Sequence, residues 1–132
     1  MQIGIWAVPA AAVAAWIFGA VWYGVMGKVW MRAQGIDPDS CKDKKMPLAP
    51  MATSFAAELL MAAGLLHLMN RLDLHRWNEG LFSGLMLGVV FVATTILVNN
   101  MFQGRKLMLT LIDSLHWIFV LAIEGLVLTL LA

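Results

Sequence analysis

Five side chains that could do chemistry lie inside long apolar stretches of this 132-residue sequence. They are Glu58, Asn99, Asp113, His116 and Glu124, and together they are called the polar cluster. Ionisable groups are costly to place in hydrocarbon, so such residues mark candidate sites for protons, ions or ligands. A histidine among carboxylates suits a proton relay, because imidazole changes charge near neutral pH.

The depth of each residue follows from counting 1.5 Å per helical residue, starting from the helix ends that carry most of the basic residues. Glu58 and His116 then lie about 15 and 14 Å deep, Asp113 about 9 Å and Asn99 about 6 Å. Glu124, at about 26 Å, comes near the opposite surface. We expect Glu58, Asp113 and His116 to face the interior of the protein, within direct or one-water reach of each other.

Three interpretations of the polar cluster remain open. It can be a structural seam in which Glu58, Asn99, Asp113 and His116 form hydrogen bonds between helices. It can be a site for a transported proton or small cation. It can also hold a metal, because Asp113 and His116 have the i, i+3 spacing of di-metal helical bundles, with Glu58 supplied by another helix.

Catalysis by a nucleophile has no support in the sequence. Ser114 precedes His116 by two residues, which puts the two on nearly opposite faces of a helix. The single cysteine, Cys41, lies in the most polar stretch, and no CxxC motif or Gly-rich phosphate loop occurs. We therefore assign no catalytic residue and no cofactor, and we expect a non-enzymatic protein.

The elements that position these residues are four long apolar segments. Hydrophobic residues make up 61% of the chain and charged residues 13%, against about 45–50% and about 25% in soluble domains. The segments are expected to be helices at about 3–27, 48–70, 80–102 and 107–131. Each exceeds the roughly 20 residues that span a bilayer. We predict an all-α, integral membrane four-helix bundle that forms a single domain over 1–132.

The basic residues predict how the bundle is oriented. The connections at 28–47 and 103–106 carry seven of the nine Lys and Arg residues, and such loops stay in the cytoplasm. The N-terminus and the C-terminus are therefore expected outside, and Cys41 in the cytoplasmic loop 28–47. A short surface helix is expected at about 38–45, since Asp37 and Pro38 resemble a helix start.

Small residues predict where the helices touch. Gly80, Gly84 and Gly88 recur every four residues, and Thr95 and Asn99 continue the same helical face. Such a stripe permits close approach of two backbones, so we expect it to pack against protein. The expected surroundings are lipid, a second copy of the chain or a larger membrane complex. A net charge of +1 argues against nucleic acid as a partner.

Two sequence motifs carry a resemblance to a known family. GAVWYGVMGKVWM at 19–31 and FVATTILVNNMF at 91–102 resemble the signatures of domain of unknown function family 1761. The resemblance implies a small four-helix protein of a bacterial membrane, and we expect the inner membrane. It implies no activity, substrate or cofactor.

The expected role is therefore a membrane-embedded accessory or interaction protein. The alternatives are an oligomeric channel or transporter for protons or small cations, and a membrane metal-binding protein that uses Asp113 and His116.

Overall fold

The computed structural model describes residues 2–41 and 47–132 of the chain. The elements are α1 (Ala7–Ala33), η1 (Pro38–Cys41), α2 (Leu48–Arg71), α3 (Trp77–Leu87), η2 (Gly88–Ala93), α4 (Thr94–Phe102) and α5 (Leu107–Leu130). All regular structure in these two stretches is helical; η1 is a single 3₁₀ turn and η2 a π-helical turn. The expected surface helix at 38–45 corresponds to η1, and its remaining residues, from 42 on, lie outside the described ones.

Four segments are long and apolar enough to cross a membrane. They are α1, α2, α5 and the continuous span Trp77–Phe102, which joins α3, η2 and α4. Large apolar side chains are exposed on every span, as on a surface that faces lipid; examples are Val25, Leu60, Phe82 and Leu107. The predicted all-α membrane architecture is confirmed.

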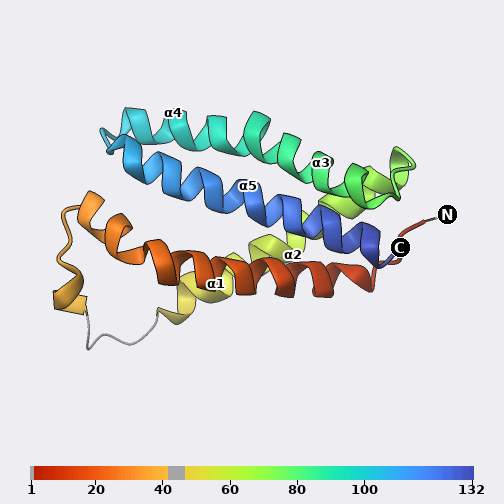
Figure 1. Cartoon of the computed structure of the whole chain (residues 1–132), viewed down its shortest axis with the longest axis horizontal. Helices are drawn as coiled ribbons and strands as arrows, with labels where there is room; N and C mark the ends of the chain where they lie inside the picture. Colours follow the sequence, from red (N-terminus) through yellow and green to blue (C-terminus); the bar gives the residue numbers. More distant parts are fainter. Residues whose placement is uncertain (1, 42–46) are drawn as a thin grey trace.

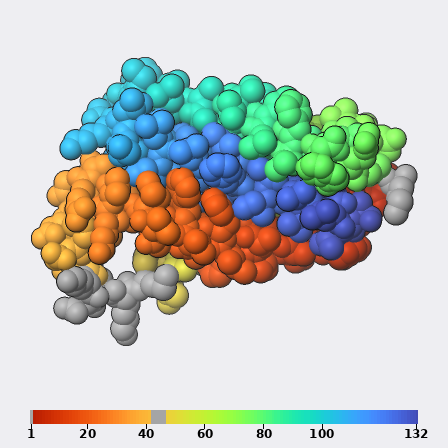
Figure 2. Space-filling view, viewed as in Figure 1, coloured from red at the N-terminus to blue at the C-terminus, as the bar shows by residue number. Residues whose placement is uncertain are grey.

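Helix α5 is the centre of the bundle. It packs against α1, α2, α3, η2 and α4. Half of the residues in its 18-residue apolar stretch are buried inside the bundle, against 28% or fewer in the corresponding stretches of the other three spans. Figure 1 shows α5 between α1 and the α3–α4 span, with α2 crossing on the far side, and Figure 2 shows these three spans side by side on the near face. The beginning of α1 and the end of α5 lie at the same end of the bundle (Figure 1).

Helix α1 continues six residues beyond the expected end at residue 27. Lys28 and Arg32 do not interrupt it, because long basic side chains can reach the polar surface while the helix continues. The helix ends before Gly35, which has a φ of 78°. The amide of Ile36 donates to the carbonyl of Met31 at 2.9 Å, the bond that closes a Schellman C-cap.

The third span begins at Trp77, three residues before the expected start at Gly80. Glu79, which precedes the expected start of this helix, accepts hydrogen bonds from the backbone amides of His75 and Arg76 at 3.0 and 2.9 Å. It therefore caps the helix, since the first amides of a helix have no partner within it. Helices α2 and α5 run within one residue of their expected ranges.

The closest helix contact joins α3 to α5. A Cβ atom on Gly80 would meet the carbonyl oxygen of Gly125, and one on Gly84 would meet that of Leu121. At Gly88 an added Cβ would lie 2.7 Å from the Cα of Ile118. The three glycines thus lie against the backbone of α5, which is the geometry that a small-residue stripe allows.

Helix α2 is displaced along the bundle relative to α1. The amide side chain of Asn70, near the end of α2, exchanges hydrogen bonds with the backbone of Ile3 at 2.8 and 3.0 Å. Trp16, in the middle of α1, already donates to the carbonyl of Met51 in the first turn of α2. The last part of α1 therefore extends beyond the beginning of α2 (Figure 1).

Candidate functional site

The structure divides the polar cluster into separate groups. Asp113 accepts two hydrogen bonds at Oδ1, from the hydroxyl of Tyr23 at 2.5 Å and from the indole nitrogen of Trp30 at 3.0 Å. Within the described chain no hydrogen bond joins Asp113 to His116 or Glu58. The expectation that these three lie within direct or one-water reach of each other stays a prediction. Tyr23 lies between two of them, because it bonds Asp113 and its ring centroid is 4.9 Å from that of His116. The last turns of α1, beyond its expected end, bring Trp30 to Asp113.

The second group consists of Glu58, Glu124 and His116. Their exposed fractions are 1%, 0% and 5%. The two carboxyl groups, called the acid pair below, are close enough to interact electrostatically. Among the described atoms, Oε2 of Glu58, both carboxyl oxygens of Glu124 and Nδ1 of His116 have no hydrogen-bond partner. Buried polar atoms in proteins rarely lack partners, so this group calls for a functional explanation.

The depth count misplaces Glu58 relative to Glu124. The count separates the two residues along the bundle axis, whereas they interact electrostatically; the depth of Glu124 near the outer surface stays a prediction. The count assumed that all helices start at one level. Because α2 begins partway along the bundle, Glu58 lies further along the axis than its place in α2 implies.

Asn99 lies near Asp113, because both line a pocket of about 400 Å³ with Tyr23 and Trp30. It is exposed, whereas the next residue, Asn100, is buried and donates to the hydroxyl of Thr110 on α5 at 3.1 Å. The π-helical turn η2 explains the difference, because such a turn inserts one extra residue into the helix. The face that starts at Gly80 therefore continues through Asn100 and not through Asn99, while the place of Asn99 in the polar cluster stays a prediction.

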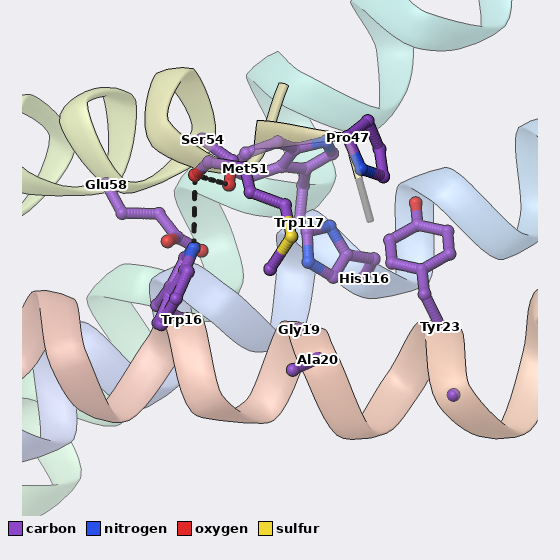
Figure 3. A pocket seen from close by; sticks show the side chains of 11 residues that line it. Trp16, Gly19, Ala20, Tyr23, Pro47, Met51, Ser54, Glu58, His116 and Trp117 are labelled. Carbon is purple, nitrogen blue, oxygen red and sulfur yellow. Dashed lines mark hydrogen bonds between the residues drawn. The ribbon is translucent and has the colours of Figure 1, made fainter. Parts of the chain in front are cut away.

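A pocket of about 430 Å³ lies between α1, α2 and α5. Glu58 and His116 both line it, together with the aromatic side chains of Trp16, Tyr23 and Trp117. Figure 3 shows Glu58 pointing from α2 toward Trp16, with His116, Trp117 and Tyr23 further along the pocket. Of the remaining lining residues only Ser54 has a polar side chain; the others are Gly19, Ala20, Gly24, Pro47 and Met51.

The side chains of this pocket are held from several sides. The indole nitrogen of Trp16 and the hydroxyl of Ser54 both donate to the carbonyl of Met51, at 3.3 and 2.9 Å (Figure 3). The ring centroid of His116 lies 4.9 Å from that of Tyr23 and 4.7 Å from that of Trp117. These contacts orient the rings before any ligand arrives.

Gly19 makes room for His116. A Cβ atom at Gly19 would lie 2.8 Å from Nε2 of the imidazole. Gly19, Trp16 and Tyr23 are site residues that their sequence context alone does not indicate. The motif at 19–31 contains Gly19 and Tyr23, but nothing in the sequence pairs them with residues on α5 about 90 positions away.

A metal site at Asp113 and His116 finds no third ligand in the described part of the chain. No group of three or more His, Cys, Asp or Glu side chains that could hold a metal ion occurs there. Asp113 is already occupied by Tyr23 and Trp30, while His116 faces the pocket with Glu58. The two residues at this i, i+3 spacing therefore have different partners: Asp113 bonds α1, and His116 lines the pocket.

The four apolar spans and the enclosed polar groups define a multi-pass helical membrane protein. Comparison with known families gives the more specific assignment. The family model described as "Protein of unknown function (DUF1761)" matches residues 6–129, so the chain belongs to this family, as the two sequence motifs predicted. The chain matches no curated protein and no solved structure.

Proposed function

We propose that this protein exchanges protons within the membrane, as the subunit of an oligomeric carrier or channel. The observation that carries the proposal is the acid pair, because Glu58 and Glu124 are both buried, and Oε2 of Glu58 and both carboxyl oxygens of Glu124 have no hydrogen-bond partner in the described chain. A purely structural seam would satisfy its polar atoms. Asn100 with Thr110 and Tyr23 with Asp113 do so, but the acid pair does not.

The chemistry of the acid pair supports proton exchange. Two buried carboxyl groups that interact electrostatically repel each other when both are charged, and a proton held by one of them relieves that repulsion. Glu58 also lines the pocket, and His116 provides an unpartnered nitrogen in the same wall, so a proton on Glu58 has a place to go.

A homo-oligomer in the bacterial inner membrane completes the proposal. The pocket opens between three helices of one chain, and four helices alone seldom enclose a path across a bilayer. A second copy placed against the pocket would extend the polar path. The alternative role, a passive accessory protein, needs no exchangeable proton and is tested by the same experiment.

The test is proton flux in proteoliposomes. A pH-sensitive dye is enclosed, and a potassium gradient with valinomycin drives protons inward. We expect flux above that of empty vesicles for the wild type, and at least a tenfold loss in Glu58→Gln and in Glu124→Gln. Glu79→Gln is the matched control, because Glu79 caps α3 away from the acid pair and glutamine can still accept its bonds. Wild-type flux equal to that of empty vesicles, or unchanged flux in both glutamine variants, would contradict the proposal.

A further inference from the structure

We propose that the pocket between α1, α2 and α5 binds a lipophilic organic cation, with its positive centre beside Glu58. This inference rests on the proposed function, because it gives the proton-exchanging carboxyl a second ligand. A volume of about 430 Å³ is in the range of pockets for drug-sized molecules. The lining is mostly apolar with a few converging polar groups, which is the usual composition of such pockets.

The sign of the charge follows from Glu58. Its side chain is 1% exposed and its Oε2 atom has no partner, yet the residue lines the pocket. Among the described residues that line the pocket, none is Lys or Arg. An anion would therefore find no positive charge among these residues to pair with, whereas a cation can pair with the carboxylate that Glu58 forms when it gives up its proton.

The shape and polarity of the ligand follow from the aromatic side chains. Trp16, Tyr23 and Trp117 form three walls of the pocket. Aromatic rings attract cations through their negative faces, tryptophan most strongly, and such cages recognise quaternary ammonium groups. A strongly hydrated inorganic cation would gain little from these walls, whereas an organic cation would use both the rings and the carboxylate.

The walls are ordered before the ligand binds. Trp16 is fixed by its bond to the carbonyl of Met51 and by an edge contact with Phe55 at 5.7 Å. Tyr23 is fixed by Asp113, 2.5 Å away. A preorganised site loses less side-chain entropy on binding, which raises affinity. The Tyr23–Asp113 bond thus acts as a positioning contact for the pocket.

Cation binding is coupled to the proton of the acid pair. When Glu58 holds that proton, binding converts its carboxylic acid into a carboxylate paired with the cation, and the proton leaves to water. Charge and atoms balance, with one proton released for each cation bound. Proton and cation therefore compete for the same carboxyl group, which would couple their movements if both cross the membrane.

The experiment compares two ions of nearly equal size and shape but opposite charge. Binding of tetraphenylphosphonium and of tetraphenylborate to purified protein in detergent is measured by equilibrium dialysis. We expect tetraphenylphosphonium to bind and tetraphenylborate to bind at least tenfold more weakly. In weakly buffered solution an indicator dye should report about one proton released per bound cation. Equal binding of the two ions would overturn the inference.

Variants link the binding to the pocket. We expect Glu58→Gln to lower the affinity for tetraphenylphosphonium at least tenfold and to abolish proton release, while Glu79→Gln leaves both unchanged. Gly19→Ala should weaken binding, because the new Cβ displaces His116 into the pocket. Circular dichroism melting shows that each variant is folded.

Unchanged tetraphenylphosphonium binding in a folded Glu58→Gln protein would also overturn the inference. Proton flux without cation binding would remove the inference and leave the proposed function intact. Cation binding without proton flux would contradict the proposed function and leave the inference about the pocket intact.

Discussion

The hydroxyl of Tyr23 donates a hydrogen bond to Oδ1 of Asp113 across 2.5 Å, and it joins two helices from residues 90 positions apart. Trp30 donates to the same oxygen at 3.0 Å. Two donors from one face of α1 thus hold one carboxyl group of α5. This contact ties the extended end of α1 to the centre of the bundle and fixes one wall of the pocket.

Replacing Tyr23 by Phe should lower the free energy of unfolding by about 1–3 kcal/mol, because Asp113 loses a partly buried hydrogen-bond donor. The measurement is unfolding of the protein in mixed micelles with a denaturing detergent. The variants Tyr23→Phe, Asp113→Asn and the double variant form a cycle. Effects that add within about 0.5 kcal/mol would show that the two side chains are not coupled.

Replacing Gly84 by Ala should destabilise the bundle by about 1–3 kcal/mol or more, because the added methyl group would meet the carbonyl oxygen of Leu121. The matched control is Gly64→Ala on α2, where an added Cβ meets nothing within 4 Å. Alanine favours a helix over glycine by about 1 kcal/mol, so this control should be as stable as the wild type or more so. Thermal unfolding in detergent separates the two. Equal stability of both variants would mean that α3 does not lie against α5.

Adjacent asparagines test the π-helical turn. Asn100→Ala should cost about 1 kcal/mol of stability, because it removes the bond to Thr110. Asn99→Ala should change stability by less than about 0.5 kcal/mol, since this side chain is exposed. The same unfolding assay applies to both. A larger loss of stability in Asn99→Ala than in Asn100→Ala would indicate an uninterrupted α-helix, in which Asn99 lies on the buried face.

The orientation of the bundle stays a prediction, and Cys41 tests it. The residue lies at the end of η1, in the connection that carries most of the basic residues. A membrane-impermeant maleimide added to intact cells should leave Cys41 unlabelled, and labelling should appear once the membrane is permeabilised. Cys41→Ser is the control for labelling of other proteins. Equal labelling in intact cells would place this loop outside.

The sequence predicts the spans well because each one is an apolar stretch of more than 20 residues, a signal that depends only on composition. The ends are predicted less well where charged residues belong to the helix. Lys28 and Arg32 suggested a loop, yet α1 continues to Ala33 and ends only where Gly35 takes a positive φ. Glu79 also suggested a loop, yet it caps α3.

The site is harder to predict because it depends on how helices are displaced relative to each other. The polarity of Glu58 and His116 marks them as members of a polar cluster, and both line the pocket. Nothing in the sequence indicates that α2 begins partway along α1, a displacement that brings Glu58 and Glu124 near enough to interact electrostatically. The π-helical turn is equally hidden, since the run Gly88–Ala93 contains only ordinary apolar residues.

The extra residue in η2 has a consequence for what the third span can lose. Deleting one residue within 89–93 would leave an ordinary α-helical turn, and because the π-helical turn already accommodates that residue as an insertion, the helices on its two sides would keep their alignment. Asn100 would still face Thr110, and the glycine contacts of α3, which precede the change, would not move. This span therefore tolerates a one-residue deletion that would rotate the rest of an ordinary membrane helix by about 100°.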